Sequence, residues 1–207
     1  MTLLHLDSSP LAGASASRRL TAAIVAAAQE ANPALAVVYR DLAAAPPAHL
    51  GGDALAPRGL PADQLTEAQK AEAAVTEELI AEFLAADVVV VGAPMYNFSI
   101  PSQLKAWIDR VAAAGRTFKY TETGPVGLSG GKTVIVASTR GGLYSEGPAS
   151  AMDHQESYLK TVFAFLGITD VRFVRAERLS LGGDQRAQAM DAALAGIQAV
   201  LPVAEAA

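Results

Sequence analysis

Short apolar runs alternate along the chain with longer stretches in which apolar residues recur every three or four positions. Four consecutive valines, Val88–Val91, form the strongest run, and an apolar run without polar alternation is typical of a strand buried on both faces. Four shorter runs predict further strands near residues 3–6, 37–39, 134–137 and 171–174. Helical spacing follows each of them and predicts helices around residues 20–27, 66–85, 101–115, 158–166 and 190–201.

This alternation indicates an α/β fold, because right-handed crossovers place the helices on both faces of a parallel sheet. Five predicted strands in 207 residues favour one domain over residues 1–207, a three-layer, doubly wound, five-stranded sheet in the flavodoxin-like order 2-1-3-4-5. In that order the ligand crevice lies at the carboxyl ends of the first and third strands. Ala43–Pro61, rich in Ala, Pro and Gly, is predicted to be a long loop.

Composition excludes several classes of function. The formal net charge is −5 and the sequence has no cluster of Lys and Arg, so nucleic acid is not an expected partner. The absence of cysteine removes disulfides, thiolate nucleophiles, iron–sulfur clusters and Cys-based zinc sites, and we predict no metal site. The first residues lack a basic segment, and no apolar run has the length of a membrane span. We therefore expect a cytoplasmic protein with no membrane partner.

Two loops at the predicted crevice have unusual composition. The loop after the first strand carries Ser9, Ser15 and Ser17 and leads into a helix, whose free N–H groups favour a phosphate. One serine would be enough to cap that helix, so we favour a phosphate site. The loop after the valine strand, Met95–Phe98, presents Tyr96 and Phe98 where a flat aromatic ligand would lie, although the same residues could simply plug the sheet edge.

A third loop, Thr139–Gly142, follows the fourth predicted strand. Its paired glycines allow close approach of the backbone to a ring system, or only a turn with Arg140 as a surface residue. Other phosphate motifs are rejected. Residues 130–133, GGKT, lack the first glycine of a P-loop and precede a strand, and the first strand is not followed by a dinucleotide-binding glycine motif. A phospho-accepting receiver domain would need more carboxylates than Asp7 at the end of the first strand.

Several motifs together resemble one enzyme family. They are the serine loop at residues 9–17, PMYNF at 94–98, QLK at 103–105, AGRTFKYTETGPVGL at 114–128 and TRGG at 139–142. The chain is similar over nearly its whole length to the FMN-dependent NADH:quinone oxidoreductases, also called azoreductases. The resemblance implies bound FMN, NADH or NADPH as electron donor, ping-pong reduction of quinones and aromatic azo compounds, and a homodimer whose active site is shared between subunits.

The resemblance also assigns residues to the site, and none of them is a catalytic acid, base or nucleophile. It implies that the FMN phosphate is held by Ser9, Ser15, Ala16 and Ser17, and that the isoalloxazine lies along Met95, Tyr96, Asn97 and Phe98. Its other side would be bordered by Thr139, Arg140, Gly141 and Gly142. Tyr120 and Tyr144 would contact substrate, though Tyr120 could equally be a hydrophobic plug beneath a loop. Tyr144 stands where many relatives carry His, and Val162 where some carry an aromatic residue.

Two rival functions remain open at this point. A flavodoxin-type electron carrier without NADH turnover would share the fold, but such carriers bind phosphate through a T-G-N-T-type loop that the serine loop lacks. A flavin-free binding protein would leave three converging loops unexplained. The sequence does not decide between NADH and NADPH, because no loop visibly recognises a 2′-phosphate.

Overall fold

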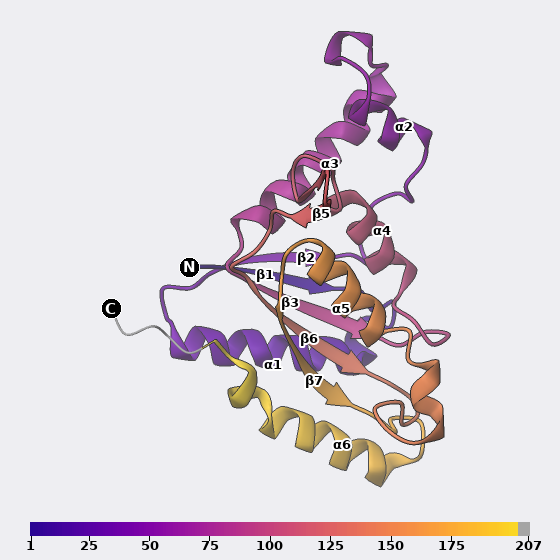
Figure 1. The fold of residues 1–207 in the computed structure, drawn as a ribbon. Helices are drawn as coiled ribbons and strands as arrows, with labels where there is room; N and C mark the ends of the chain where they lie inside the picture. The colour runs from indigo at the N-terminus through magenta and orange to yellow at the C-terminus, as the bar shows by residue number, and fades with distance from the viewer. Residues whose placement is uncertain (203–207) are drawn as a thin grey trace.

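The computed structural model describes residues 1–202 and builds one central parallel sheet between two layers of helices (Figure 1). The five strands of this sheet are ordered β2-β1-β3-β6-β7. Their bounds are β1 Thr2–Asp7, β2 Ala36–Asp41, β3 Val88–Pro94, β6 Thr133–Thr139 and β7 Asp170–Ala176. The predicted order is confirmed, because β4 Phe118–Thr121 and β5 Gly124–Gly127 form a separate hairpin between the third and fourth strands of the sheet.

The helices are α1 Ala16–Ala31, α2 Gly52–Leu55, α3 Glu67–Ala85, α4 Ser102–Val111, α5 Glu156–Phe165 and α6 Gly183–Ala195. Short 3₁₀ segments occupy Ala12–Ala14, Ala56–Arg58, Ala62–Gln64, Pro148–Met152 and Ile197–Val200. Within residues 1–202, no helix is both long and apolar enough to cross a membrane.

The valine strand is buried on both faces, as its composition predicts. All residues of β3 are buried, and alternate side chains enter two different cores. Val89 and Val91 pack with α3, α4 and α5, where Phe83 meets Trp107 edge to face at 5.6 Å. Val88 and Val90 pack with α1 and α6 on the opposite face. Burial on both sides therefore fixes β3 at the centre of the molecule.

Capping residues mark the starts of α1 and α3, and the bounds of α4 differ slightly from those predicted. Ser15 caps α1 by accepting from the Arg18 N–H, and Thr66 forms a reciprocal capping box with Gln69 at the start of α3. Pro101 lies at the N-cap of α4, one position before the first turn in which we expected it. That helix ends at Val111, where the buried Thr117 hydroxyl donates to the Val111 carbonyl at 2.6 Å, rather than near Gly115.

Two sequence-based predictions need correction. Ala43–Pro61 is not loop throughout, because residues 52–58 form α2 and a 3₁₀ turn. The buried Arg110 holds this segment in place by donating to the Ala48 carbonyl at 2.9 Å. The last helix also begins and ends earlier than predicted: α6 spans Gly183–Ala195, and Gly196 leads into a 3₁₀ turn that still buries Ile197.

Candidate functional site

The three loops singled out in the sequence leave the sheet at neighbouring strand ends. Leu6 of β1 lies beside Val91 of β3, and Pro94 at the end of β3 lies beside Thr139 at the end of β6. Hydrogen bonds continue past the strands: the Ser8 hydroxyl donates to the Gly92 carbonyl at 2.5 Å, and the Met95 N–H donates to the Thr139 carbonyl at 2.8 Å. The carboxyl edge of the sheet therefore brings the loops together, as the fold rule for open α/β sheets predicts.

The serine loop is folded as a donor-rich helix entrance. Ser9 and Ser17 are almost fully buried, and the Ser15 and Ser17 hydroxyl oxygens lie 3.0 Å apart. The Ser9 and Ser15 hydroxyl oxygens accept the backbone N–H groups of Leu11 and Arg18, which leaves their O–H groups to donate elsewhere. The N–H groups of Ala16 and Ser17 belong to the first turn of α1 and have no carbonyl within the helix to bind. These groups together suit an anion with several oxygens.

Arg18 fastens this loop to the neighbouring strand. Its guanidinium donates to the Ser9 carbonyl at 3.0 and 3.3 Å and binds both carboxylate oxygens of Asp41, at the end of β2, at 2.7 Å each. The Arg18 hydrogen bond lowers the pKa of Asp41 against a smaller opposing effect of burial. The serine loop is therefore braced without any ligand.

Asp7, buried beneath the same loop, is also held as a carboxylate. It accepts from the Thr21 hydroxyl at 2.8 Å and the Tyr39 hydroxyl at 3.1 Å. Burial raises the pKa of Asp7, but hydrogen bonds from His5 and Thr21, with the charge of Arg18, lower it on balance.

The Met95–Phe98 segment makes a tight turn of unusual backbone geometry. The Tyr96 and Ser99 backbones exchange two hydrogen bonds of 2.9 and 3.0 Å, and Asn97 and Phe98 between them have φ angles of +48° and +70°. Two consecutive positive φ angles are typical of a type I′ turn, in which Asn is common and a bulky aromatic is strained. This turn holds the partly exposed Phe98 ring 6.2 Å from the Tyr144 ring, in an edge-to-face arrangement. Strain of this kind gathers at ligand sites.

The glycines of the TRGG loop anchor it to the segment after β7 and leave two backbone N–H groups free in the part of the chain that the structure describes. The Gly141 and Gly142 carbonyls bind the N–H groups of Ser180 and Arg178, whereas within residues 1–202 their own N–H groups have no partner. A Cβ on Gly141 would lie 2.7 Å from the Ser180 Oγ, so a larger residue there would require the Ser180 side chain to move. Two adjacent unpaired N–H groups are suitable donors for a carbonyl oxygen of a ligand.

Arg140 is not a surface residue. It is 1% exposed, and its guanidinium is turned toward α5 and the carboxylates of Asp153, Glu156 and Glu177. Its backbone N–H and carbonyl also bind other parts of the protein, Ala176 and Leu179. Ligand contact by Arg140 therefore stays a prediction, and its side chain has a different environment from the one expected.

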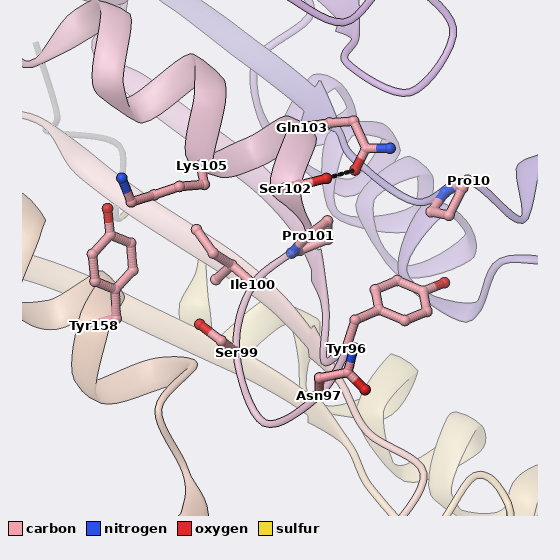
Figure 2. A pocket seen from close by; sticks show the side chains of 10 residues that line it. All are labelled: Pro10, Tyr96, Asn97, Ser99, Ile100, Pro101, Ser102, Gln103, Lys105 and Tyr158. Atoms are coloured by element: carbon pink, nitrogen blue, oxygen red, sulfur yellow. Dashed lines mark hydrogen bonds between the residues drawn. The ribbon is translucent and has the colours of Figure 1, made fainter. Parts of the chain in front are cut away.

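A cleft with a volume of about 570 Å³ adjoins the Met95–Phe98 turn (Figure 2). Tyr96 and Asn97 face it at one end near Pro10, and Lys105 and Tyr158 face it at the other. Burial, with the nearby charge of Asp109, raises the pKa of Tyr158 to about 12, so its phenol stays protonated. The cleft is an open space beside the three loops, lined by apolar and neutral polar groups along most of its length. Its full lining is Pro10, Tyr96, Asn97, Ser99, Ile100, Pro101, Ser102, Gln103, Lys105 and Tyr158.

Comparison with known proteins agrees with this arrangement. The model of the flavodoxin-like fold family matches residues 1–201. An FMN-dependent NADH:quinone oxidoreductase of Ralstonia nicotianae is 65% identical over 202 residues, which cover 97% of each chain. This chain belongs to the FMN-dependent NADH:quinone oxidoreductase family.

The fold of this oxidoreductase is similar to that of solved azoreductase structures. An azoreductase from Bacillus anthracis strain Sterne is 33% identical with a TM-score of 0.87, covering 97% of this chain and 98% of its own. An FMN-dependent NADH-azoreductase from the Ames Ancestor strain, solved in complex with FMN, is 26% identical with a TM-score of 0.86 and 96% coverage of both chains. The family resemblance read from the motifs is confirmed.

Tyr120 of this oxidoreductase lies apart from the three loops. The β4–β5 hairpin that carries it packs where α5 turns into β7: Phe118 contacts Phe165 at 4.5 Å, and Gly127 is pressed against Gly167. The loops lie beyond the other end of β7, which at seven residues is roughly 20 Å long. Tyr120 itself is 73% exposed, so it is not a plug beneath its own loop.

Sequence reasoning about the oxidoreductase missed three residues that organise the site. Arg18 follows the serines directly and Asp41 ends the adjacent strand, so their pairing was open to prediction from the parallel order of β1 and β2. Gln155 is fully buried and joins two strand ends, donating to the Ala93 carbonyl at 2.5 Å and accepting from the Ser138 hydroxyl at 3.0 Å. No local pattern marks Gln155, because its partners lie 17 and 62 positions away.

Proposed function

We propose that this protein, as one domain over residues 1–207, uses bound FMN to reduce quinones and to cleave aromatic azo compounds at the expense of NADH, in ping-pong order. The observation that carries the proposal is the meeting of three loops at one sheet edge: the serine loop and the TRGG loop have donors that the protein itself does not use within residues 1–202, and the Met95–Phe98 turn provides an aromatic wall. Membership of the oxidoreductase family supports the same reaction.

The serine loop fits the phosphate of FMN. Hydroxyls of Ser9, Ser15 and Ser17 and the first-turn N–H groups of Ala16 and Ser17 supply neutral donors at the positive end of the α1 dipole. Arg18 keeps the Ser9 carbonyl turned toward its own guanidinium, so that a carbonyl oxygen does not compete with the phosphate for these donors.

The other two loops fit the ring of FMN. The strained turn at Asn97 and Phe98 holds a rigid wall beside Tyr96, and the free N–H groups of Gly141 and Gly142 would donate to a ring carbonyl. FMN, when bound there, accepts a hydride from NADH and passes two electrons to the acceptor. The protein's share is to orient the ring, hold its phosphate and keep water out, and no side chain is required as acid or base. The pairing of Phe98 with Tyr144 provides an apolar cover for that purpose.

The position of Tyr120 supports a homodimer with shared active sites. One chain holds this tyrosine and the flavin loops at opposite ends of β7, so a single chain does not bring them together. The hairpin exposes Tyr120, Val126 and Leu128, an apolar surface that a second copy would cover. We propose that Tyr120 of one subunit contacts the acceptor bound at the other subunit.

Flavin binding tests the proposal first. Apoprotein titrated with FMN should quench its fluorescence, and the reconstituted protein should oxidise NADH rapidly only when a quinone or an azo dye is present. Ser17→Ala should weaken FMN binding roughly tenfold through loss of a charge-assisted hydrogen bond, whereas Thr161→Ala, which removes an exposed α5 hydroxyl, should not.

Two results would contradict the proposed function, and a third would define its electron donor. Protein that cannot be reconstituted with FMN excludes the flavoenzyme. Flavin that cycles one electron at a time without NADH turnover identifies an electron carrier of the flavodoxin type. Equal turnover with NADPH would show that the donor site does not discriminate against a 2′-phosphate.

A further inference from the structure

A fully buried arginine lies beside the proposed flavin site and is surrounded by three carboxylates from two segments of the chain. The Arg140 Nη2 lies 2.9 Å from Asp153 and 2.6 Å from Glu156, and its Nη1 donates to Glu177 at 3.1 Å. Its Nε donates to the side-chain oxygen of Gln155 at 2.9 Å. A desolvated guanidinium with this many partners is set in one position.

Glu177 links the fixed guanidinium of Arg140 to the loop that carries Tyr144. The carboxylate oxygen that binds Arg140 also accepts the backbone N–H groups of Tyr144 at 2.8 Å and Ser145 at 3.0 Å. The second oxygen of Glu177 accepts the Ser145 hydroxyl. Since Glu177 directly follows β7, its carboxylate ties Tyr144 and Ser145 to the end of the sheet.

The opposite side of the network reaches Phe98. Gln155, which accepts from Arg140, donates to the carbonyl of Ala93, just before the Met95–Phe98 turn. The neighbouring His154 N–H donates to the Phe98 carbonyl at 3.0 Å. Phe98 is therefore connected to the network around Arg140 through His154 and Gln155, and Tyr144 is connected to it through Glu177.

We propose that Arg140 is a positioning residue for acceptor binding: acting through Glu177, it places Tyr144 against Phe98 and so sets the affinity for quinone and azo acceptors. This inference rests on the proposed function. In this role Arg140 needs no contact with FMN, which agrees with the direction of its guanidinium. Its effect on acceptor binding acts through Tyr144.

Lysine does not replace arginine at this position. The guanidinium donates from Nη1 to Glu177 and from Nε to Gln155 while its Nη2 lies within 2.9 Å of the Asp153 and Glu156 carboxylates, whereas an ammonium group is a single compact charge on a flexible stem. In an Arg140→Lys protein, Asp153 still caps α5 through the N–H groups of Gln155 and Glu156, and Glu156 still binds Arg175. Glu156 therefore keeps a second cationic partner, whereas Asp153 and Glu177 lose the guanidinium, and of these two Glu177 is the one that holds the Tyr144 and Ser145 N–H groups.

The test is steady-state kinetics of the FMN-loaded enzyme with a water-soluble quinone and an anionic azo dye. Arg140→Lys should raise the acceptor KM roughly tenfold while the FMN dissociation constant changes less than about threefold. Arg175→Lys is the matched control, because Arg175 binds the same Glu156 carboxylate from the surface, at 2.7 and 2.8 Å. That variant should leave both quantities unchanged.

A double-variant cycle separates positioning from general damage. In a Tyr144→Ala background, Arg140→Lys should raise the acceptor KM no further, since the group that it positions is gone. An unchanged KM in Arg140→Lys, or an increase of the same size with and without Tyr144, overturns the inference.

If Arg140→Lys does not fold, Glu177→Gln answers the same question, and its KM must rise for the inference to stand. Failure of the wild-type protein to bind FMN or to oxidise NADH would refute the proposed function instead, and that result is seen before any variant is made.

Discussion

Gly92 lies at a crowded contact of β3 with the end of β1 and with α1, next to the serine loop. A Cβ at this position would stand 3.0 Å from the Asp7 carboxylate and 3.2 Å from the Thr21 methyl group, and both neighbours are fixed by the hydrogen bond between them. Gly92→Ala should therefore lower the free energy of unfolding by roughly 1–3 kcal/mol, as overpacking does in tight cores. Urea denaturation measures the change.

Gly13→Ala serves as the comparison for Gly92→Ala. No atom lies within 4 Å of a Cβ on Gly13, in the exposed part of the same loop, so its effect should stay within about 0.5 kcal/mol. Equal effects of the two variants would mean that the Gly92 contact relaxes at no cost.

The residues around Arg140 show where sequence reasoning stops. The loop and its glycines were found from the pattern, because turn chemistry is local. The environment of Arg140 was not, because its partners at positions 153, 156 and 177 are brought to it by α5 and β7. Whether a charged side chain can be buried depends on such distant partners, and a single sequence does not reveal them.

At the scale of elements, the strands were predicted closely and the hairpin was not predicted as strands. Buried strands such as β3 and β6 are marked by continuous apolar runs, whereas β4 and β5 leave Lys119, Tyr120 and Val126 exposed and show no such run. Helix α2 was missed for a related reason, since four residues among Ala, Pro and Gly are too short for a periodic signal. These elements depend on their neighbours for their stability.

Lys132 has a structural role at the end of an element, although its GGKT context has the appearance of a phosphate motif. Its Nζ donates to the carbonyls of Leu84 and Ala86 at 2.7 and 2.5 Å and so closes the carboxyl end of α3. Lys132→Met should cost about 1–2 kcal/mol in the free energy of unfolding, read from urea denaturation. Lys70→Met, which removes an exposed lysine from the first turn of the same helix, should cost far less; a similar loss would show that charge alone is responsible.

At the scale of the whole molecule, buried carboxylates make stability depend on pH at its acid end. Burial raises the pKa of Glu177, but hydrogen bonds from Ser145 and Tyr144, with the charge of Arg140, lower it on balance below its usual 4.5. Asp7 and Asp41 are likewise lowered from 3.8. A lowered pKa in the folded state means that the unfolded chain binds more protons, so this stability is present above pH 4.5 and is lost as the pH falls through the folded-state values.

We therefore expect the urea midpoint to change little between about pH 6 and 8 and to fall steeply below pH 4.5. Glu177→Gln should remove part of that slope because the group no longer titrates. A slope identical to that of the wild type would show that the Glu177 carboxylate contributes nothing to acid sensitivity.

The separation of Tyr120 from the flavin loops gives a direct test of sharing between subunits. Two variants are needed: Tyr120→Ala, which would bind FMN but lack the tyrosine, and one with both Ser15 and Ser17 changed to Ala, which would retain Tyr120 but lose FMN. Alone, the first should show a raised acceptor KM and the second little turnover.

In mixed dimers, the FMN held by the Tyr120→Ala subunit faces the intact tyrosine of its partner, so the acceptor KM should return to the wild-type value. Because the two groups lie about one β7 length apart in a single chain, roughly 20 Å, restoration cannot arise within one subunit. A mixture whose KM stays at the Tyr120→Ala value, after exchange of subunits has been verified, would show that Tyr120 acts in its own chain or not at all.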